Sequence, residues 1–187
     1  MKQVLLGTLV GGVIFFIFLS ISWTVLPFHT MAFTPLEDSK PIAEAMQANN
    51  LETGLYTVPS MTEYEANSEE FIERHKAGPV VPFLVYYAEG LEMMSAMMYV
   101  KGIIMALLAA GIVSVMMKLA GRRLRRYPLR VLVATAMGVF AAVIGPLTLG
   151  NWMMFPAGYV WAEVFDQVIG WTFAGAGIAA FVKPRSL

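Results

Sequence analysis

Residues 92–117 read EMMSAMMYVKGIIMALLAAGIVSVMM, an apolar run in which Lys101 is the only charge after Glu92. A run of this length can cross about 30 Å of hydrocarbon as an α-helix. It is followed at once by KLAGRRLRRYPLR, residues 118–130, where six side chains are basic and none is acidic. An apolar run that ends in a short basic link is typical of a helix that stops at a membrane surface.

The same kind of apolar run occurs three more times, at residues 4–25, 129–149 and 159–182. The chain is 58% hydrophobic and 14% charged, a composition typical of membrane proteins. Ser20–Ser22 could be a signal-peptide cleavage site, but the first run has the length of a span, which favours a retained helix. We therefore expect an all-α membrane protein, a four-helix bundle with a small extracytoplasmic cap.

The expected domains follow from these runs. They are transmembrane helix 1 in residues 1–26, the cap in residues 27–90, and transmembrane helices 2–4 in residues 91–187, with an Arg-rich link at 118–128.

The distribution of basic residues predicts the orientation. Lys2 precedes the first run, and Lys183 and Arg185 follow the fourth, on the same side as the Arg-rich link. The cap contains only three basic residues. The positive-inside rule therefore places both termini in the cytoplasm. Residues 122–126 are interpreted as a topology signal, and binding of anionic headgroups is the alternative.

The cap itself is predicted to be partly folded. Ser39 begins one expected helix, which ends near Asn50, and Asn67 begins a second, which ends before Gly78. Residues 55–58 and 80–87 are candidate strands. Ten acidic residues outnumber the three basic ones in residues 27–90. A solvated face explains this excess, and docking of a basic partner is the alternative.

Two charges within the spans are expected to meet. Lys101 lies seventeen residues before Lys118, and Asp166 lies seventeen residues before Lys183. Both charges would then stand about 25 Å from the same membrane surface. A charge at that depth is costly unless it is paired or hydrated. We expect a structural ion pair of Lys101 with Asp166, with Glu163 on the same helix face. A polar pocket and a proton or ion relay are the alternatives.

Methionine is unusually frequent, with fourteen residues in the chain. Thioether and imidazole side chains at one membrane surface would suit Cu(I). Flexible apolar packing is the other explanation for so many methionines. The candidate metal ligands are Met94, Met97, Met98, Met153, Met154 and His29.

Small residues recur at helical spacing in two of the spans. Gly7 and Gly11 form such a face in the first run, and Gly170, Ala174 and Gly175 form one in the fourth. Such faces let helices approach closely in lipid. Packing within one chain is the favoured interpretation, and pairing with a second copy is the alternative.

The stretch from Gly11 through Ser22-Trp23-Thr24-Val25-Leu26-Pro27-Phe28-His29 resembles the opening of small uncharacterised four-span bacterial inner-membrane proteins. In that group the first span ends in Ser-Trp-x-x-Leu-Pro-x-His. Asn151-Trp152 and Phe155-Pro156 are also similar to that group. The resemblance implies a four-span architecture in a bacterial inner membrane, and it implies no activity and no site residues.

The sequence contains no recognisable catalytic signature and no cysteine. We therefore expect no enzyme and no cofactor, with copper as the alternative. The favoured function is a non-enzymatic accessory or assembly subunit of a larger inner-membrane complex. Extracytoplasmic copper handling and a small transporter are the alternatives. The expected partners are the lipid bilayer and either a membrane protein or a second copy of the chain, and no nucleic acid.

Overall fold

The computed structural model describes residues 1–183, and Arg185 of the predicted basic C-terminal flank lies outside them. The protein is mostly helical, with 73% helix and 6% strand. It divides into two compact units, one formed by Met1–Thr34 with the chain from Met94 onward, and the other by Pro35–Met93. The predicted boundary of the cap at residues 27 and 90 therefore moves to 35 and 93. The reason is that residues 27–32 form a short helix that packs on the bundle.

The first unit contains four helices long and apolar enough to cross a membrane, which confirms the predicted four-span bundle. Two short elements accompany them, the helix α2 (Pro27–Ala32) and a 3-10 turn, η1 (Gly121–Leu124). The spans are α1 (Lys2–Thr24), α6 (Ala96–Ala120), α7 (Tyr127–Ala142) with its continuation to Trp152, and α9 (Ala157–Phe181).

The third span is not one regular α-helix. After α7 the chain passes through a π-helical turn, η2 (Val143–Leu147), and then a short helix, α8 (Thr148–Trp152). Pro146 lies inside the π turn. Proline has no N–H to donate and clashes with the preceding turn of an α-helix, so the widened turn accommodates it. The distortion thus lies at the Gly145-Pro146 pair.

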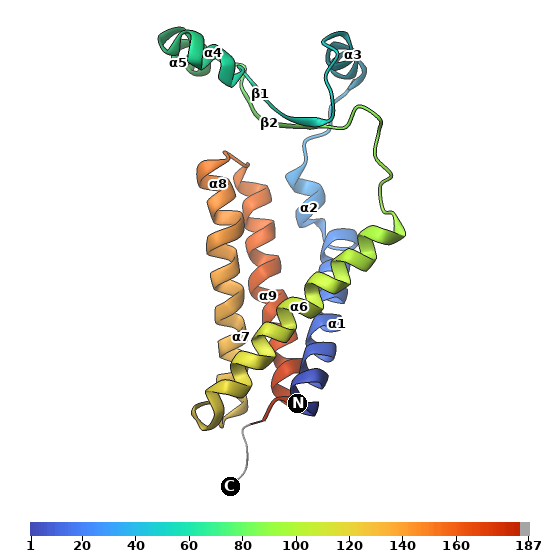
Figure 1. Ribbon diagram of the computed structural model, residues 1–187, viewed down its shortest axis with the longest axis vertical. Helices are drawn as coiled ribbons and strands as arrows, with labels where there is room; N and C mark the ends of the chain where they lie inside the picture. The colour runs from blue at the N-terminus through green and yellow to red at the C-terminus, as the bar shows by residue number, and fades with distance from the viewer. Residues whose placement is uncertain (184–187) are drawn as a thin grey trace. The chain divides into compact units, whose positions relative to one another are not determined.

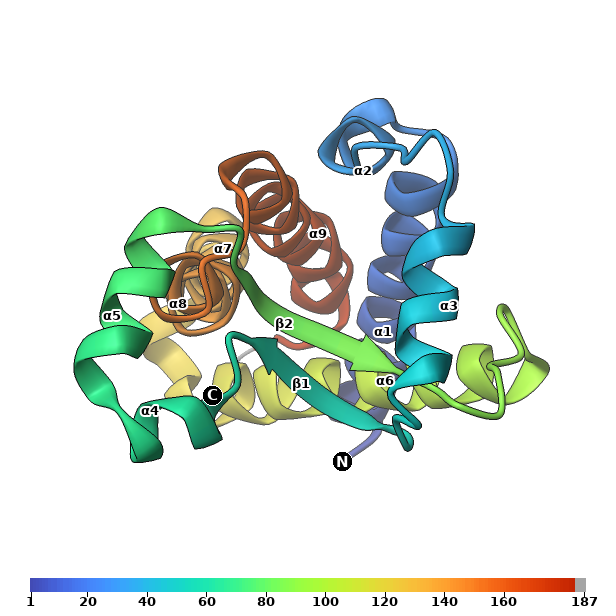
Figure 2. The ribbon, with the colours of Figure 1, turned by 90° about the horizontal axis from the view of Figure 1, so that it is seen from above.

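The order of the helices around the bundle is α6, α1, α9 and α7 (Figures 1 and 2). α1 lies between α6 and α9, so these two helices have little contact with each other. Glycines explain the close approach of α1 and α9. A Cβ at Gly11 would lie 2.3 Å from Ile178 Cγ1, and one at Gly170 would lie 2.8 Å from the Phe15 ring. The small-residue faces are thus used within the chain.

The centre of the bundle is filled by side chains of all four spans. Phe15 of α1 stacks on Trp171 of α9 with ring centroids 4.6 Å apart. Ala110 of α6, Ala134 of α7 and Ile178 of α9 are completely buried around this pair. Burial of these apolar groups and the close contacts of the small residues hold the helices in fixed positions.

Gly138 of α7 provides a test of this packing. A Cβ at this position would lie 2.5 Å from the Gln167 carbonyl oxygen and 2.8 Å from Trp171 Cβ. Backbone atoms cannot rotate away, so Gly138→Ala is expected to separate α7 from α9 and to cost about 1–3 kcal/mol of unfolding free energy. Unfolding in mild detergent measures this. Gly111→Ala is the control, because its Cβ would meet Thr8 at an ordinary 3.5 Å; equal losses from both changes would contradict the argument.

The second unit, Pro35–Met93, consists of three helices and a two-stranded antiparallel sheet. The strands pair Gly54 with Tyr86 and Tyr56 with Leu84, and the register shifts between Tyr56 and Val58. Within this unit α3 lies at one end of the sheet, and α4 and α5 lie at the other (Figures 1 and 2). The elements are α3 (Lys40–Ala48), β1 (Gly54–Val58), α4 (Met61–Ala66), α5 (Ser68–Ala77) and β2 (Val81–Tyr86).

Local sequence signals explain most of these elements. Asn67 caps α5 by accepting a hydrogen bond from the Glu70 backbone N–H, as its sequence predicted. Gly78 ends that helix with a φ of +64°, a conformation that favours glycine. The helix α4 was not predicted. It begins with a capping box in which Ser60 and Glu63 satisfy each other's backbone N–H groups.

Candidate functional site

A cluster of buried polar side chains lies at the end of the bundle where α1 finishes and α9 begins. Ser22 of α1 donates a hydrogen bond to Asp166 Oδ1 of α9 at 2.5 Å. His29 Nε2 of α2 lies 3.0 Å from Asp166 Oδ2 and 3.4 Å from Ser22 Oγ. None of the three residues is more than 1% exposed. Both oxygens of the buried carboxylate therefore have partners, as a desolvated charge requires.

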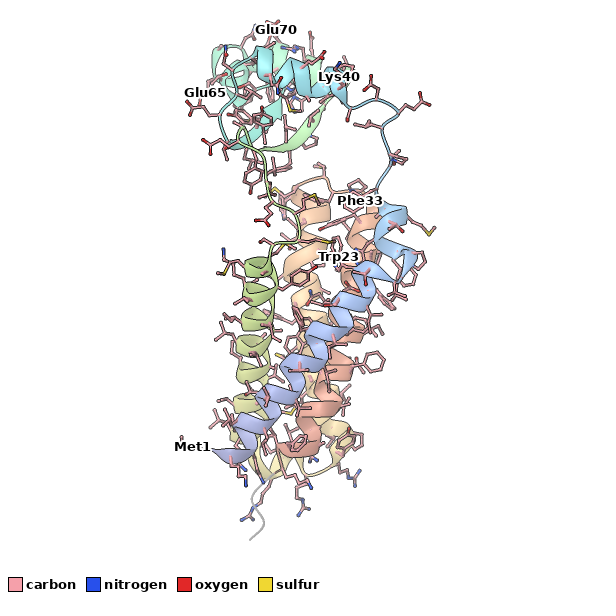
Figure 3. All side chains as sticks on the ribbon, turned by 90° about the vertical axis from the view of Figure 1, so that its right-hand side faces the viewer. Met1, Trp23, Phe33, Lys40, Glu65 and Glu70 are labelled. Carbon is pink, nitrogen blue, oxygen red and sulfur yellow. The ribbon has the colours of Figure 1, made fainter. Side chains whose placement is uncertain are left out.

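The break in the helix between α1 and α2 brings His29 to this place. α1 ends at Thr24, Leu26 is extended, and Pro27 begins α2, where its missing N–H costs nothing. α2 packs against both α1 and α9. The His29 ring stacks on Trp23 with centroids 4.0 Å apart and an interplanar angle of 15°. Trp23 stands at the end of α1, next to α2 (Figure 3).

Glu163 is the second acidic residue near this histidine. Its Oε1 lies 3.9 Å from His29 Nδ1, and its side chain is 21% exposed. Within residues 1–183, His29 Nδ1 is one of two buried side-chain polar atoms without a hydrogen-bond partner. Glu163 and Asp166 are also the only acidic residues in the sequence of the bundle unit. Both negative charges of this unit thus face one imidazole ring.

The arrangement does not fit nucleophilic catalysis. A catalytic serine must give its proton to a base, with the carboxylate on the other ring nitrogen of the histidine. Here Ser22 donates to Asp166 and not to the histidine, and Asp166 faces the same nitrogen, Nε2, as the serine. The other carboxylate, Glu163, is 3.9 Å from Nδ1, beyond hydrogen-bonding distance. Ser22 is also fully buried. The cluster therefore joins α1, α2 and α9 by hydrogen bonds.

The predicted ion pair of Lys101 with Asp166 is not formed, because Asp166 has other partners. Asp166 is bound by Ser22 and His29, whereas Lys101 is exposed and has no ion pair within residues 1–183. The physical reason is the order of the helices, because α1 lies between α6 and α9. Glu163, the predicted companion, faces His29 instead.

The six predicted copper ligands are not gathered into one place. Met94 precedes α6, and Met97 and Met98 lie in its first turn. Met153 and Met154 follow α8, and the start of α6 and the end of α8 lie on opposite sides of the bundle (Figures 1 and 2). His29 is held by Asp166 and buried under Trp23. Among residues 1–183, no group of three or more His, Asp or Glu side chains is placed to hold a metal ion.

Buried polar groups do not form a path across the bundle. In the described part of the chain they are Ser22, His29 and Asp166 at one end, and Ser114 and Arg130 in the other half. Ser114 lies beside Gly7 at the start of α1, far along the helix from Ser22. A proton or ion relay needs a continuous series of such groups. This arrangement does not favour the transporter alternative.

The Pro35–Met93 unit contains a second candidate site, an apolar groove of about 890 Å³ between α3 and the sheet. Ile42, Ala45 and Met46 of α3 line one side, and Leu55 and Val58 of β1 belong to the other. The side chains of α3 and of β1 that line this space are mostly apolar. Two apolar surfaces therefore face an open space.

The same unit has almost no core of its own. Of residues 35–93, only Pro59 is buried. Leu55 and Val85 are cross-strand neighbours and remain 61% and 66% exposed. A two-stranded sheet is marginally stable in water unless another element covers it. Uncovered apolar groups of this kind mark a surface for a further protein segment.

The four helices long and apolar enough to cross a membrane define this chain as a multi-pass helical membrane protein. It also has a buried polar cluster and a small unit with an open groove. No protein-family model, curated protein or solved structure matches it.

Proposed function

We propose that the protein is a non-enzymatic accessory or assembly subunit of a bacterial inner membrane that docks a partner protein through residues 35–93. In this proposal the Arg-rich link and both termini lie in the cytoplasm, and the Pro35–Met93 unit lies outside it. The observation that carries the proposal is the apolar groove in a unit with one buried residue. The buried cluster supports it, because His29 holds α2, from which the chain enters this unit.

The electrostatic charge of the unit limits what can occupy the groove. Residues 35–93 contain eleven acidic and three basic side chains, a net charge of −8 with histidine neutral. Glu65 and Glu70 reach outward from α4 and α5 (Figure 3). A second copy of the unit would bring a further −8, and an anionic membrane surface would also be repelled. The charge therefore favours a basic segment of a different protein.

The shape of the groove favours an extended segment. Four consecutive residues, Leu55 to Val58, line it, and β1 pairs with β2 along one edge only. The other edge of β1 has backbone N–H and C=O groups free to pair with an added strand. Alternate side chains of that strand would contact α3. The proposed occupant is an extended apolar segment with basic flanks.

Site-specific photo-crosslinking in cells tests the proposal. A photo-reactive residue at Met46 or Val58, inside the groove, is expected to react with one peptide of another protein that has an apolar centre and basic flanks. Ile72 of α5 serves as the control position, because it is exposed and does not line the groove. Mass spectrometry identifies the joined peptides.

A substitution in the groove tests whether binding depends on its apolar walls. Val58→Glu is expected to reduce the crosslinked product from position 46 by about tenfold or more, since an unpaired charge buried in an apolar contact costs over about 1.4 kcal/mol. Ile72→Glu, the matched change at an exposed apolar position of α5, should leave the yield within about twofold. Equal yields from groove and control positions, or an acidic peptide at the groove, would refute the proposal.

A further inference from the structure

The other end of the bundle has a concentration of positive charge around η1. Lys118, Arg130 and the four arginines of residues 121–126 lie there, and no acidic residue occurs between 118 and 130. Glu163 and Asp166, the only acidic side chains in the sequence of this unit, are held at the opposite end of α9. Within residues 1–183, the fold therefore supplies no acidic side chain at this end to balance the charge.

Two of the six basic side chains are used within the bundle. Lys118 Nζ donates to Gln3 Oε1 at 2.6 Å and to the Lys183 carbonyl at 2.9 Å. Arg130 is 5% exposed and donates to three backbone carbonyls. These two residues join the ends of the helices, so they are not free for a ligand.

The other four basic residues are exposed and unused. Their side chains have no ion pair or hydrogen bond within residues 1–183. The next helix, α7, has neither a side-chain cap nor an acidic residue in its first turn, so its positive end adds to the local field. The four residues are Arg122, Arg123, Arg125 and Arg126.

The position of this turn identifies the kind of anion. It connects α6, which ends at Ala120, with α7, which begins at Tyr127, so it lies where two spans leave the hydrocarbon. Leu119 and Tyr127 beside it are 81% and 46% exposed, as residues in contact with lipid are. We infer that residues 121–126 bind the phosphate of anionic phospholipid headgroups. Guanidinium groups suit this role, because they bind phosphate through paired N–H donors.

Lipid binding to the purified full-length protein tests the inference independently of any protein partner. Native mass spectrometry in detergent compares phosphatidylglycerol with phosphatidylcholine of the same acyl chains. Each guanidinium near an anionic surface contributes about a fivefold preference. The wild type is therefore expected to favour phosphatidylglycerol by at least about tenfold. The combined change Arg122→Gln, Arg123→Gln, Arg125→Gln and Arg126→Gln should abolish that preference.

A variant with the same loss of charge elsewhere is the control. It combines Lys40→Gln, Arg74→Gln, Lys76→Gln and Lys101→Gln and should keep the preference within about twofold. The wild type alone gives a second measurement, because raising the salt from about 0.05 M to about 0.5 M should weaken the preference severalfold. No preference in the wild type, retention of it in the arginine variant, or equal loss in the control would overturn the inference.

Discussion

Replacing His29 by phenylalanine is expected to lower the unfolding free energy by about 3–5 kcal/mol, because the buried Asp166 carboxylate loses its main partner. Phenylalanine keeps an aromatic ring against Trp23, so the loss reports on Nε2 and not on the stacking. Asp166→Leu should cost about 2–4 kcal/mol, since Ser22 and His29 each lose a hydrogen bond in a buried place. Denaturant or thermal unfolding in mild detergent at neutral pH measures both.

The double change separates a coupled pair from two independent residues. His29→Phe with Asp166→Leu leaves no unpaired charge, so its cost should fall short of the sum of the single costs by about 1.5 kcal/mol or more. Asp166→Asn should be mild, because the amide keeps the shape and can still donate to an imidazole nitrogen and accept from Ser22. Additive single effects would mean that the pair is not coupled.

Lys101→Met is the control that decides between the two proposed partners of Asp166. The Lys101 side chain is exposed and unpaired in the described part of the chain, so its replacement should change stability by less than about 0.5 kcal/mol. A large loss from Lys101→Met that disappears in combination with Asp166→Leu would instead support the pair expected from equal depth in the two spans.

The four spans could be predicted because the physical requirement for crossing a membrane is simple. A segment that crosses hydrocarbon must satisfy its backbone groups internally and present apolar side chains, so it appears as a long uncharged run. The first run was placed at residues 4–25 and the helix occupies Lys2–Thr24. The fourth was placed at 159–182 and occupies Ala157–Phe181. Such small differences at helix ends are expected, because flanking polar residues can extend a span into the interface.

The partner of Asp166 was not predictable in the same way. The spacing along the sequence gives the depth of Lys101 and Asp166 in the membrane. It does not indicate which helix lies next to each of these residues. That depends on the close packing of Gly7, Gly11 and Gly170, which brings α1 against α9. A usable signal was nevertheless present, because Pro27 can begin a helix as well as end one. A turn of helix after Pro27 directs His29 back to the bundle, where the two acidic residues of that unit lie.

For residues 35–93, most of the secondary structure could be predicted from the sequence, but the groove could not. Short runs of β-branched and aromatic residues predicted both strands, and Asn67 and Gly78 predicted the limits of α5. The groove was not predictable, because it depends on the distance between α3 and the sheet. Sequence patterns indicate which face of an element is apolar, but they do not indicate whether that face is covered.

Arg130→Met is the second change with a large expected effect. Its Nε donates to the Ala179 carbonyl at 3.1 Å, and its Nη1 donates to the carbonyls of Leu124 and Arg125 at 2.9 and 3.0 Å. Ala179 lies in the last turn of α9, where carbonyls lack a donor from their own helix. Methionine keeps the apolar stem and leaves all three carbonyls unpaired, so we expect a loss of about 3–5 kcal/mol.

Arg126→Met is the matched control, one helical turn away on the same link. Its side chain is exposed and forms no hydrogen bond within residues 1–183, so it should change stability by less than about 0.5 kcal/mol. Hydrogen exchange gives a local measurement, because Arg130→Met should speed exchange at the end of α9 and at η1. If both changes prove equally mild, water or lipid headgroups replace the guanidinium donors. Arg130 would then belong with the exposed arginines as a lipid contact and would not be a structural link between α7 and α9.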